Sequence, residues 1–149
     1  MGGTNDILAL ELKNITNPDR RARFTFSLPA LSPDESVRDR FFASLSNIDN
    51  RRHEPWVLDS LAFLNHPLRR THAERYIQPS LNLLMEIQRT GDIFFPTRWT
   101  QSVLDGHNSP AAAQTVTAFL AAQKDYPPRL RQIVEQSADN LLRAAKIVR

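Results

Sequence analysis

His53 and Glu54 begin the stretch of this sequence that comes nearest to a hydrolytic metal motif. A zinc peptidase of the HExxH type needs two histidines four positions apart on a helix, so that both reach one ion, with a glutamate between them as the base. Here Val57 stands where the second histidine is needed, and Pro55 sits at a helix start. We therefore predict no metal ligands and no catalytic residues in this chain.

Other side chains that could do chemistry also lack the required spacing. The sequence has no cysteine, which excludes a thiolate nucleophile or metal cluster, and its four glycines cannot form a P-loop or a dinucleotide fingerprint. No GxSxG elbow supports a serine hydrolase, although a Ser/His/Asp site assembled across the fold stays open. The histidines show no ligand spacing, and surface or capping roles are favoured for all four: His53, His66, His72 and His107.

Arginine dominates the basic residues of this 149-residue chain, whose net charge is +3. Sixteen arginines stand against Lys13, Lys124 and Lys146, which suits bidentate carboxylate pairing better than solvated point charges. Doublets such as Arg51-Arg52 are scattered among acidic residues, so a solvated face is favoured over a phosphate track. For this reason we expect no nucleic-acid partner. We also expect no membrane partner, since no apolar run is long enough to span a bilayer.

Helix starts are marked by cap residues followed by proline at Asn17-Pro18, Ser32-Pro33 and Ser109-Pro110. Ser32 with Glu35 also fits a capping box. Apolar stripes at helical spacing follow, the first containing Val37, Phe41, Leu45 and Ile48. Further helices are predicted over residues 6–14, 71–91, 96–105 and 110–123 and from Pro127-Pro128 onward, and another carries Val57, Leu61 and Leu64.

One proline and one glycine are expected to interrupt or end the helix predicted over residues 71–91. Its stripe is formed by Ile77, Leu81, Leu84 and Ile87. Pro79 is expected to kink the helix or to split off its first turn, and Gly91 is expected to end it in the left-handed conformation. The apolar Ile93, Phe94 and Phe95 then form a turn, where packing against the flanking helix ends is favoured over contact with a partner.

The segment Leu64–Trp99, LNHPLRRTHAERYIQPSLNLLMEIQRTGDIFFPTRW, resembles the C-terminal region of M1-family zinc aminopeptidases. Its densest part is RTGDIFFPTRW, and the resemblance extends over roughly residues 17–145. It implies an all-α domain, which we predict as about eight antiparallel helices in a HEAT-like or armadillo-like stack. The alternation of apolar residues from Ala22 to Leu28 is typical of a strand, but a lone strand has no partner, so we predict helix there as well.

The same resemblance implies a non-catalytic domain that covers the catalytic domain and shapes substrate access in the parent enzyme. Zinc would belong to the parent, because this chain lacks both HExxH and GxMEN, the latter reading the substrate's free amine in that family. The expected partners are the catalytic domain and a peptide substrate. Candidate contacts with them lie in the matching segment: Arg75, Arg89, Phe94, Phe95, Arg98 and Trp99.

The expected organisation is a single helical domain over residues 1–149, the distal part of such a C-terminal domain, with residues 1–3 as an expression scar. A bacterial cytoplasm or periplasm is the expected compartment. The alternative function is a freestanding HEAT-like protein-interaction module, which would show the same helices and the same lack of catalytic residues. We expect the isolated chain to bind no catalytic zinc and to cleave no aminoacyl substrate.

Overall fold

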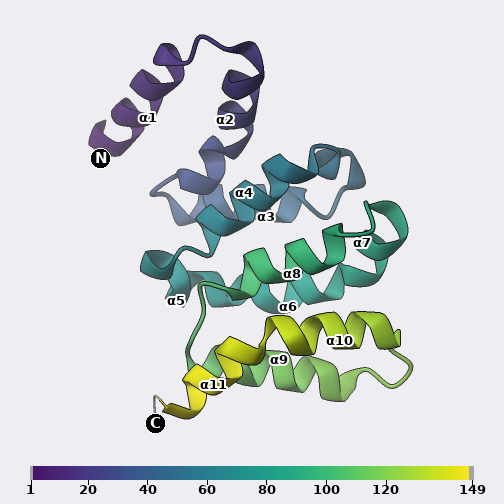
Figure 1. The fold of residues 1–149 in the computed structure, drawn as a ribbon. Coiled ribbons are helices and arrows are strands. Elements are labelled where there is room, and N and C mark those ends of the chain that lie inside the picture. Colours follow the sequence, from purple (N-terminus) through teal and green to yellow (C-terminus); the bar gives the residue numbers. More distant parts are fainter. Residues whose placement is uncertain (1, 148–149) are drawn as a thin grey trace. The chain divides into compact units, whose positions relative to one another are not determined.

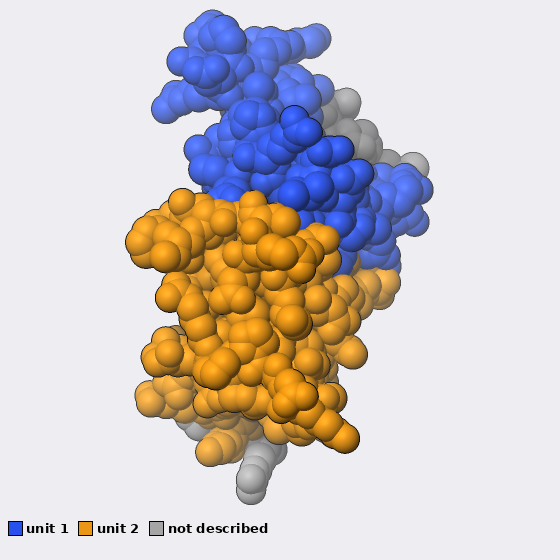
Figure 2. Space-filling view, turned by 90° about the vertical axis from the view of Figure 1, so that its right-hand side faces the viewer, with its two compact units in different colours: residues 1–63 blue, residues 64–149 orange. Residues whose placement is uncertain are grey.

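The computed structural model describes the backbone of residues 2–147 and the side chains of residues 8–146, and all regular structure in this range is helical. The predicted all-α class is therefore confirmed for the described residues. The chain divides into two compact units, residues 1–63 and 64–149 (Figure 2). None of the helices in the described part of the chain has the length and apolarity needed to cross a bilayer.

Unit 1 is built from α1 (Gly2–Asn14), α2 (Pro18–Leu31), α3 (Glu35–Ser44), the 3-10 helix η1 (Ile48–Arg51) and α4 (Glu54–Leu64), which ends at the first residue of unit 2 (Figure 1). The predicted cap of α2 is confirmed, since the Asn17 side chain accepts from the amides of Asp19 and Arg20 at 2.9 and 3.1 Å. The alternating segment from Ala22 to Leu28 lies inside α2, so the helix prediction there is confirmed.

The predicted capping box at the start of α3 is wrong. Asp34 is the N-cap, and its Oδ1 accepts from the Ser36 amide at 2.8 Å. Ser32 instead accepts from the Asp34 amide at 3.1 Å and serves as the C-cap of α2. Ser32 and Asp34 are both suitable cap residues in this short loop. Asp34 takes the N-cap position of α3, where its negative charge also interacts favourably with the helix dipole.

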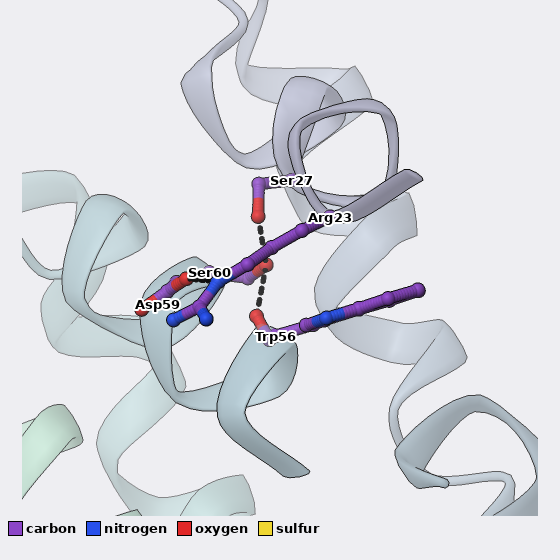
Figure 3. A network of polar contacts seen from close by, with 5 residues as sticks. All are labelled: Arg23, Ser27, Trp56, Asp59 and Ser60. Carbon is purple, nitrogen blue, oxygen red and sulfur yellow. Dashed lines mark hydrogen bonds and ion pairs between the residues drawn. The ribbon is translucent and has the colours of Figure 1, made fainter. Parts of the chain in front are cut away.

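Polar contacts join α2 to α4 within unit 1 (Figure 3). The Arg23 Nε donates to Asp59 Oδ2 at 2.5 Å, and this hydrogen bond raises the pKa of the Arg23 guanidinium. The Ser60 hydroxyl lies 3.1 Å from the Ser27 hydroxyl and 2.9 Å from the Trp56 carbonyl oxygen. Both contacts are satisfied when Ser60 donates to the carbonyl and Ser27 donates to Ser60.

Aromatic side chains fill the space around these contacts. The Phe26 ring centroid lies 5.5 Å from that of Phe41, nearly edge to face, and 5.7 Å from that of Trp56. Such pairs add about 0.5–1.5 kcal/mol beyond the area that they bury. Phe42 is buried, whereas Phe41 and Trp56 are half-buried.

Arginines that are buried or half-buried donate to the carbonyl groups that end helices, where the backbone lacks partners within the helix. The guanidinium groups of Arg38, Arg51 and Arg131 donate to the carbonyl oxygens of the C-cap residues Ser32, Leu45 and Gln123 at 2.7, 2.7 and 2.9 Å. The solvated face predicted for the arginine doublets is therefore wrong for Arg51, which is buried. A planar guanidinium with several N–H groups suits this role better than a lysine ammonium group.

Unit 2 contains the remaining helices, which continue from η2 (Pro67–Arg69), α5 (Arg70–Ala73), η3 (Glu74–Tyr76), α6 (Ile77–Asn82) and α7 (Leu84–Thr90) through α8 (Phe95–Leu104), α9 (Pro110–Ala122) and α10 (Pro128–Ser137) to α11 (Asp139–Ile147). Helix α8 packs against α6, α7 and α10, while α9 packs against α6 and α11 (Figure 1). The core between them is apolar, with Trp99, Val103, Leu84 and Leu130 fully buried.

The single helix expected over residues 71–91 is instead four short elements, α5, η3, α6 and α7. Pro79 falls in the first turn of α6, where its missing N–H costs no helical hydrogen bond. The break before α7 is at Leu83, whose amide bonds to the Ser80 carbonyl in the tighter i−3 pattern at 3.3 Å. The last predicted helix is also divided, at Ala138, so residues 2–147 hold more helical elements than the eight expected.

Replacing Leu84 by alanine is expected to lower the free energy of unfolding of unit 2 by about 2–5 kcal/mol, because the fully buried side chain would leave a cavity. Thermal and urea denaturation followed by circular dichroism measure this loss. Met85→Ala is the matched control, since the next side chain is 52% exposed and should change stability by less than about 0.5 kcal/mol. Equal melting curves for Leu84→Ala and the unchanged protein would contradict the burial of this residue.

Candidate functional site

The turn between α7 and α8 is held by its own backbone and by one carboxylate. The Gly91 amide bonds to the Ile87 carbonyl, and the Asp92 Oδ1 accepts from the Phe94 amide, both at 2.9 Å. Gly91 has φ −105° and ψ −179°, so the predicted left-handed stop is wrong. The chain leaves α7 in an extended conformation, and the Asp92 side chain then turns it into α8.

This turn divides its three consecutive apolar residues between solvent and core. Ile93 and Phe94 are 64% and 59% exposed, whereas Phe95 is 3% exposed. Phe95 is the first residue of α8, so its side chain points toward the helices that α8 covers, and its ring lies 5.9 Å from that of Trp99. The packing role favoured from the sequence is therefore correct for Phe95 and wrong for Ile93 and Phe94, which are exposed.

Trp99 lies at the centre of unit 2. Its side chain is fully buried, and the indole Nε1 donates to the Ser80 carbonyl oxygen on α6 at 3.0 Å. The hydrogen bond satisfies the polar end of a residue that is otherwise apolar. Trp99 and Phe95, both candidate contacts in the sequence, are therefore parts of the core and present no surface to a partner.

The arginine candidates are exposed and lie on different elements. The Arg98 guanidinium carbon lies 5.6 Å from the Phe94 ring centroid, within the range of a cation–π contact. Arg89 is in the last turn of α7, and Arg75 is in η3, where its Nε donates to the His72 carbonyl at 3.1 Å. The structure thus brings together Ile93, Phe94 and Arg98, which we call the corner patch.

A buried polar cluster at the α8–α9 loop was not predicted. His107 Nε2 lies 2.9 Å from Asn65 Oδ1, and both residues are buried, so the surface or capping role predicted for this histidine is wrong. A Cβ on Gly106 would overlap the Asn65 carbonyl oxygen, which explains why glycine stands in this loop. The two segments are 42 residues apart in sequence, so no local pattern could have indicated their contact.

Burial lowers the pKa of the His107 imidazole below 6.5, the charge of Glu74 opposes this, and the charge of Arg70 adds to it. The neutral ring is therefore favoured in the folded state. The neutral, buried imidazole of His107 therefore contributes stability above pH 6.5. This stability is lost as the pH falls from 6.5 through the lower folded-state pKa, because the unfolded chain binds a proton more readily than the folded chain.

We expect the melting temperature of the chain to fall over this range more steeply than that of His107→Gln, which retains a hydrogen-bonding group and does not titrate. The difference between the two stabilities should change by up to about 1.4 kcal/mol per pH unit. Parallel melting temperatures for the two proteins between pH 7.5 and 5 would contradict the neutral buried state.

A groove of about 460 Å³ runs between α6 and α9 and was also missed in the sequence. It is lined by amide-bearing, hydroxyl, alanine and phenylalanine side chains: Gln78, Asn82, Ala111, Gln114, Thr115, Ala118, Phe119, Ala122 and Gln123. Gln78 and Asn82 are four positions apart and so lie on one face of α6. This spacing is the one feature of the sequence that could have indicated the groove. Nothing in the sequence indicated that α9 would form the opposite wall.

Among the described residues, no group of three or more histidine, aspartate or glutamate side chains is placed to hold a metal ion. The side chains of residues 8–146 thus offer no set of ligands that fits a zinc ion. Comparison with known proteins identifies no relative: no family model matches the chain, and neither a curated protein nor a solved structure is significantly similar to it.

Proposed function

We propose that this chain is the distal part of the C-terminal helical domain of an M1-family zinc aminopeptidase, where it covers the catalytic domain and shapes access of the peptide substrate. The proposal is supported by the sequence resemblance over roughly residues 17–145 and by the all-helical structure of the described residues. The zinc and the peptide-bond hydrolysis belong to the parent enzyme in this proposal, and the present chain contributes a binding surface.

The corner patch is the observation that carries the proposed contact with the catalytic domain. It leaves two large apolar side chains in solvent within RTGDIFFPTRW, the segment that most resembles the family. Aromatic and arginine side chains are enriched among the residues that dominate protein–protein binding energy. Burying Ile93 and Phe94 against another domain would remove this apolar surface from water, at about 25 cal/mol for each Å² buried.

Arg89 and Arg98 flank the corner on α7 and α8 and are both exposed. A guanidinium group binds a carboxylate through two parallel hydrogen bonds. We propose a carboxylate of the catalytic domain or of the peptide as the ligand of these arginines. Arg75 is a weaker candidate, because its Nε already donates to a backbone carbonyl.

A HEAT-like or armadillo-like stack is the arrangement that we propose for the helices of unit 2. The contacts of α8 with α10 and of α9 with α11 support it, because each joins a helix to the next but one along the chain. Stacked helix pairs bury a continuous core and leave long side surfaces for partners.

The reading frame upstream of this segment in its source genome tests the proposal. We expect it to continue in frame into a sequence with HExxH followed by a downstream glutamate, and with GxMEN. A stop codon directly upstream, or an upstream domain without these motifs, would contradict the proposal and leave the freestanding interaction module as the remaining candidate.

A further inference from the structure

The groove lies within unit 2, where α6 and α9 pack against each other. Gln78 and Asn82 form the α6 wall, Gln114 lies on α9, and Gln123 is the C-cap residue of α9. Alanines of α9 lie between these amides. The small alanine side chains leave room for the backbone of a ligand to approach α9 closely. The side-chain amides on both walls of the groove can then reach that backbone.

The lining of the groove is uncharged, although 23% of the chain is charged. Within the described range 8–146, the side-chain amides of Gln78, Asn82, Gln114 and Gln123 make no hydrogen bond, and Gln123 accepts from Arg131 through its backbone carbonyl. Each of these amides offers both donors and an acceptor. Their chemistry therefore matches a neutral ligand that itself presents donors and acceptors in alternation, as a peptide main chain does.

The spacing of the amides on α6 fits an extended chain. Four residues of an α-helix rise about 6.0 Å, at 1.5 Å each. Two residues of an extended strand rise about 6.6–6.8 Å. Gln78 and Asn82, four positions apart, can therefore bond to successive peptide groups on the same side of a strand that runs along α6.

We propose that the groove between α6 and α9 binds an extended, neutral peptide segment through its main chain, with Gln78, Asn82 and Gln114 hydrogen-bonding to successive peptide groups. Side chains of the ligand contribute little, because the lining holds no charge and its one large apolar side chain, Phe119, is only 6% exposed. The proposal rests on residues of unit 2 and stands apart from the assignment to an aminopeptidase.

A blocked octapeptide of alternating threonine and serine is the probe, with an analogue N-methylated at every residue as its matched control. The full chain labelled with ¹⁵N is titrated with each peptide, and backbone and side-chain amide shifts are followed by NMR. We expect saturable shifts that include the side-chain amides of Gln78, Asn82 and Gln114, and at least about tenfold weaker binding of the N-methylated analogue, which lacks the main-chain donors.

Asn82→Leu and Gln114→Leu test the two walls separately, and both residues are exposed, so folding should be retained. Each is expected to weaken binding about two- to tenfold, as for the loss of one hydrogen bond. The control Gln132→Leu, an exposed glutamine of α10 outside the groove, should leave binding unchanged.

Three results would overturn the proposal. The first is equal affinity for the two peptides, or no saturable shifts at millimolar concentration. The second is unchanged affinity in both wall variants. The third is a concentration-dependent shift of the groove amides without any peptide, which would mean that a second copy of the chain occupies the groove.

Discussion

Replacing Trp99 by alanine should lower the free energy of unfolding of unit 2 by about 3–5 kcal/mol, among the largest effects of any single substitution in this chain. The side chain is fully buried on α8, and its loss would leave a cavity between α8 and the helices packed on it. The substitution would also leave the Ser80 carbonyl oxygen without the donor that it now has at 3.0 Å. Equilibrium urea denaturation measures the change.

Trp99→Phe separates the two causes. Phenylalanine retains most of the apolar packing but has no N–H, and the Ser80 carbonyl oxygen still accepts from the Leu83 amide. We therefore expect a smaller loss of about 0.5–1.5 kcal/mol, the net scale of one hydrogen bond. If Trp99→Ala cost less than about 1 kcal/mol, the central position of this residue in unit 2 would be contradicted.

Phe95→Ser and Phe94→Ser should differ sharply although the residues are adjacent. The buried Phe95 contacts Trp99, and its replacement is expected to cost about 3–5 kcal/mol. The exposed Phe94 makes a cation–π contact with the guanidinium of Arg98, so its replacement should cost less than about 1 kcal/mol. Melting temperatures of the two variants decide the matter, and equal losses would contradict the division of this turn between core and solvent.

Local signals in the sequence predicted most of the helix starts, because caps and prolines act within a few residues. Asn17 and Ser109 cap α2 and α9 as expected, with Ser109 Oγ accepting from the Ala112 amide at 3.0 Å. The start of α3 was misplaced because Ser32 and Asp34 both satisfy the cap pattern, and the choice depends on the loop between the helices. The prediction of one long helix ending at Gly91 was wrong because the residues where the helix breaks, such as Leu83, are neither proline nor glycine.

The candidate site was predictable only in part. The turn that holds the corner patch was found from its unusual run of apolar residues, but the sequence could not say which of them face solvent. The contact of His107 with Asn65 and the groove between α6 and α9 depend on segments that meet only in the folded chain. The buried guanidinium of Arg51 was missed for another reason: its partner is a helix-end carbonyl six residues earlier in the chain and not a nearby charge.

Association of the chain with a separately expressed catalytic portion of the proposed parent aminopeptidase tests the proposed function most directly. Calorimetry should detect binding of the unchanged chain, and Phe94→Ser should weaken it by at least about 1 kcal/mol, or fivefold, while the melting temperature is retained. The matched control is Leu68→Ser, because this side chain is 89% exposed and lies outside the corner patch. Binding that is equally strong for the unchanged chain and both variants, or absent for all three, would contradict the account.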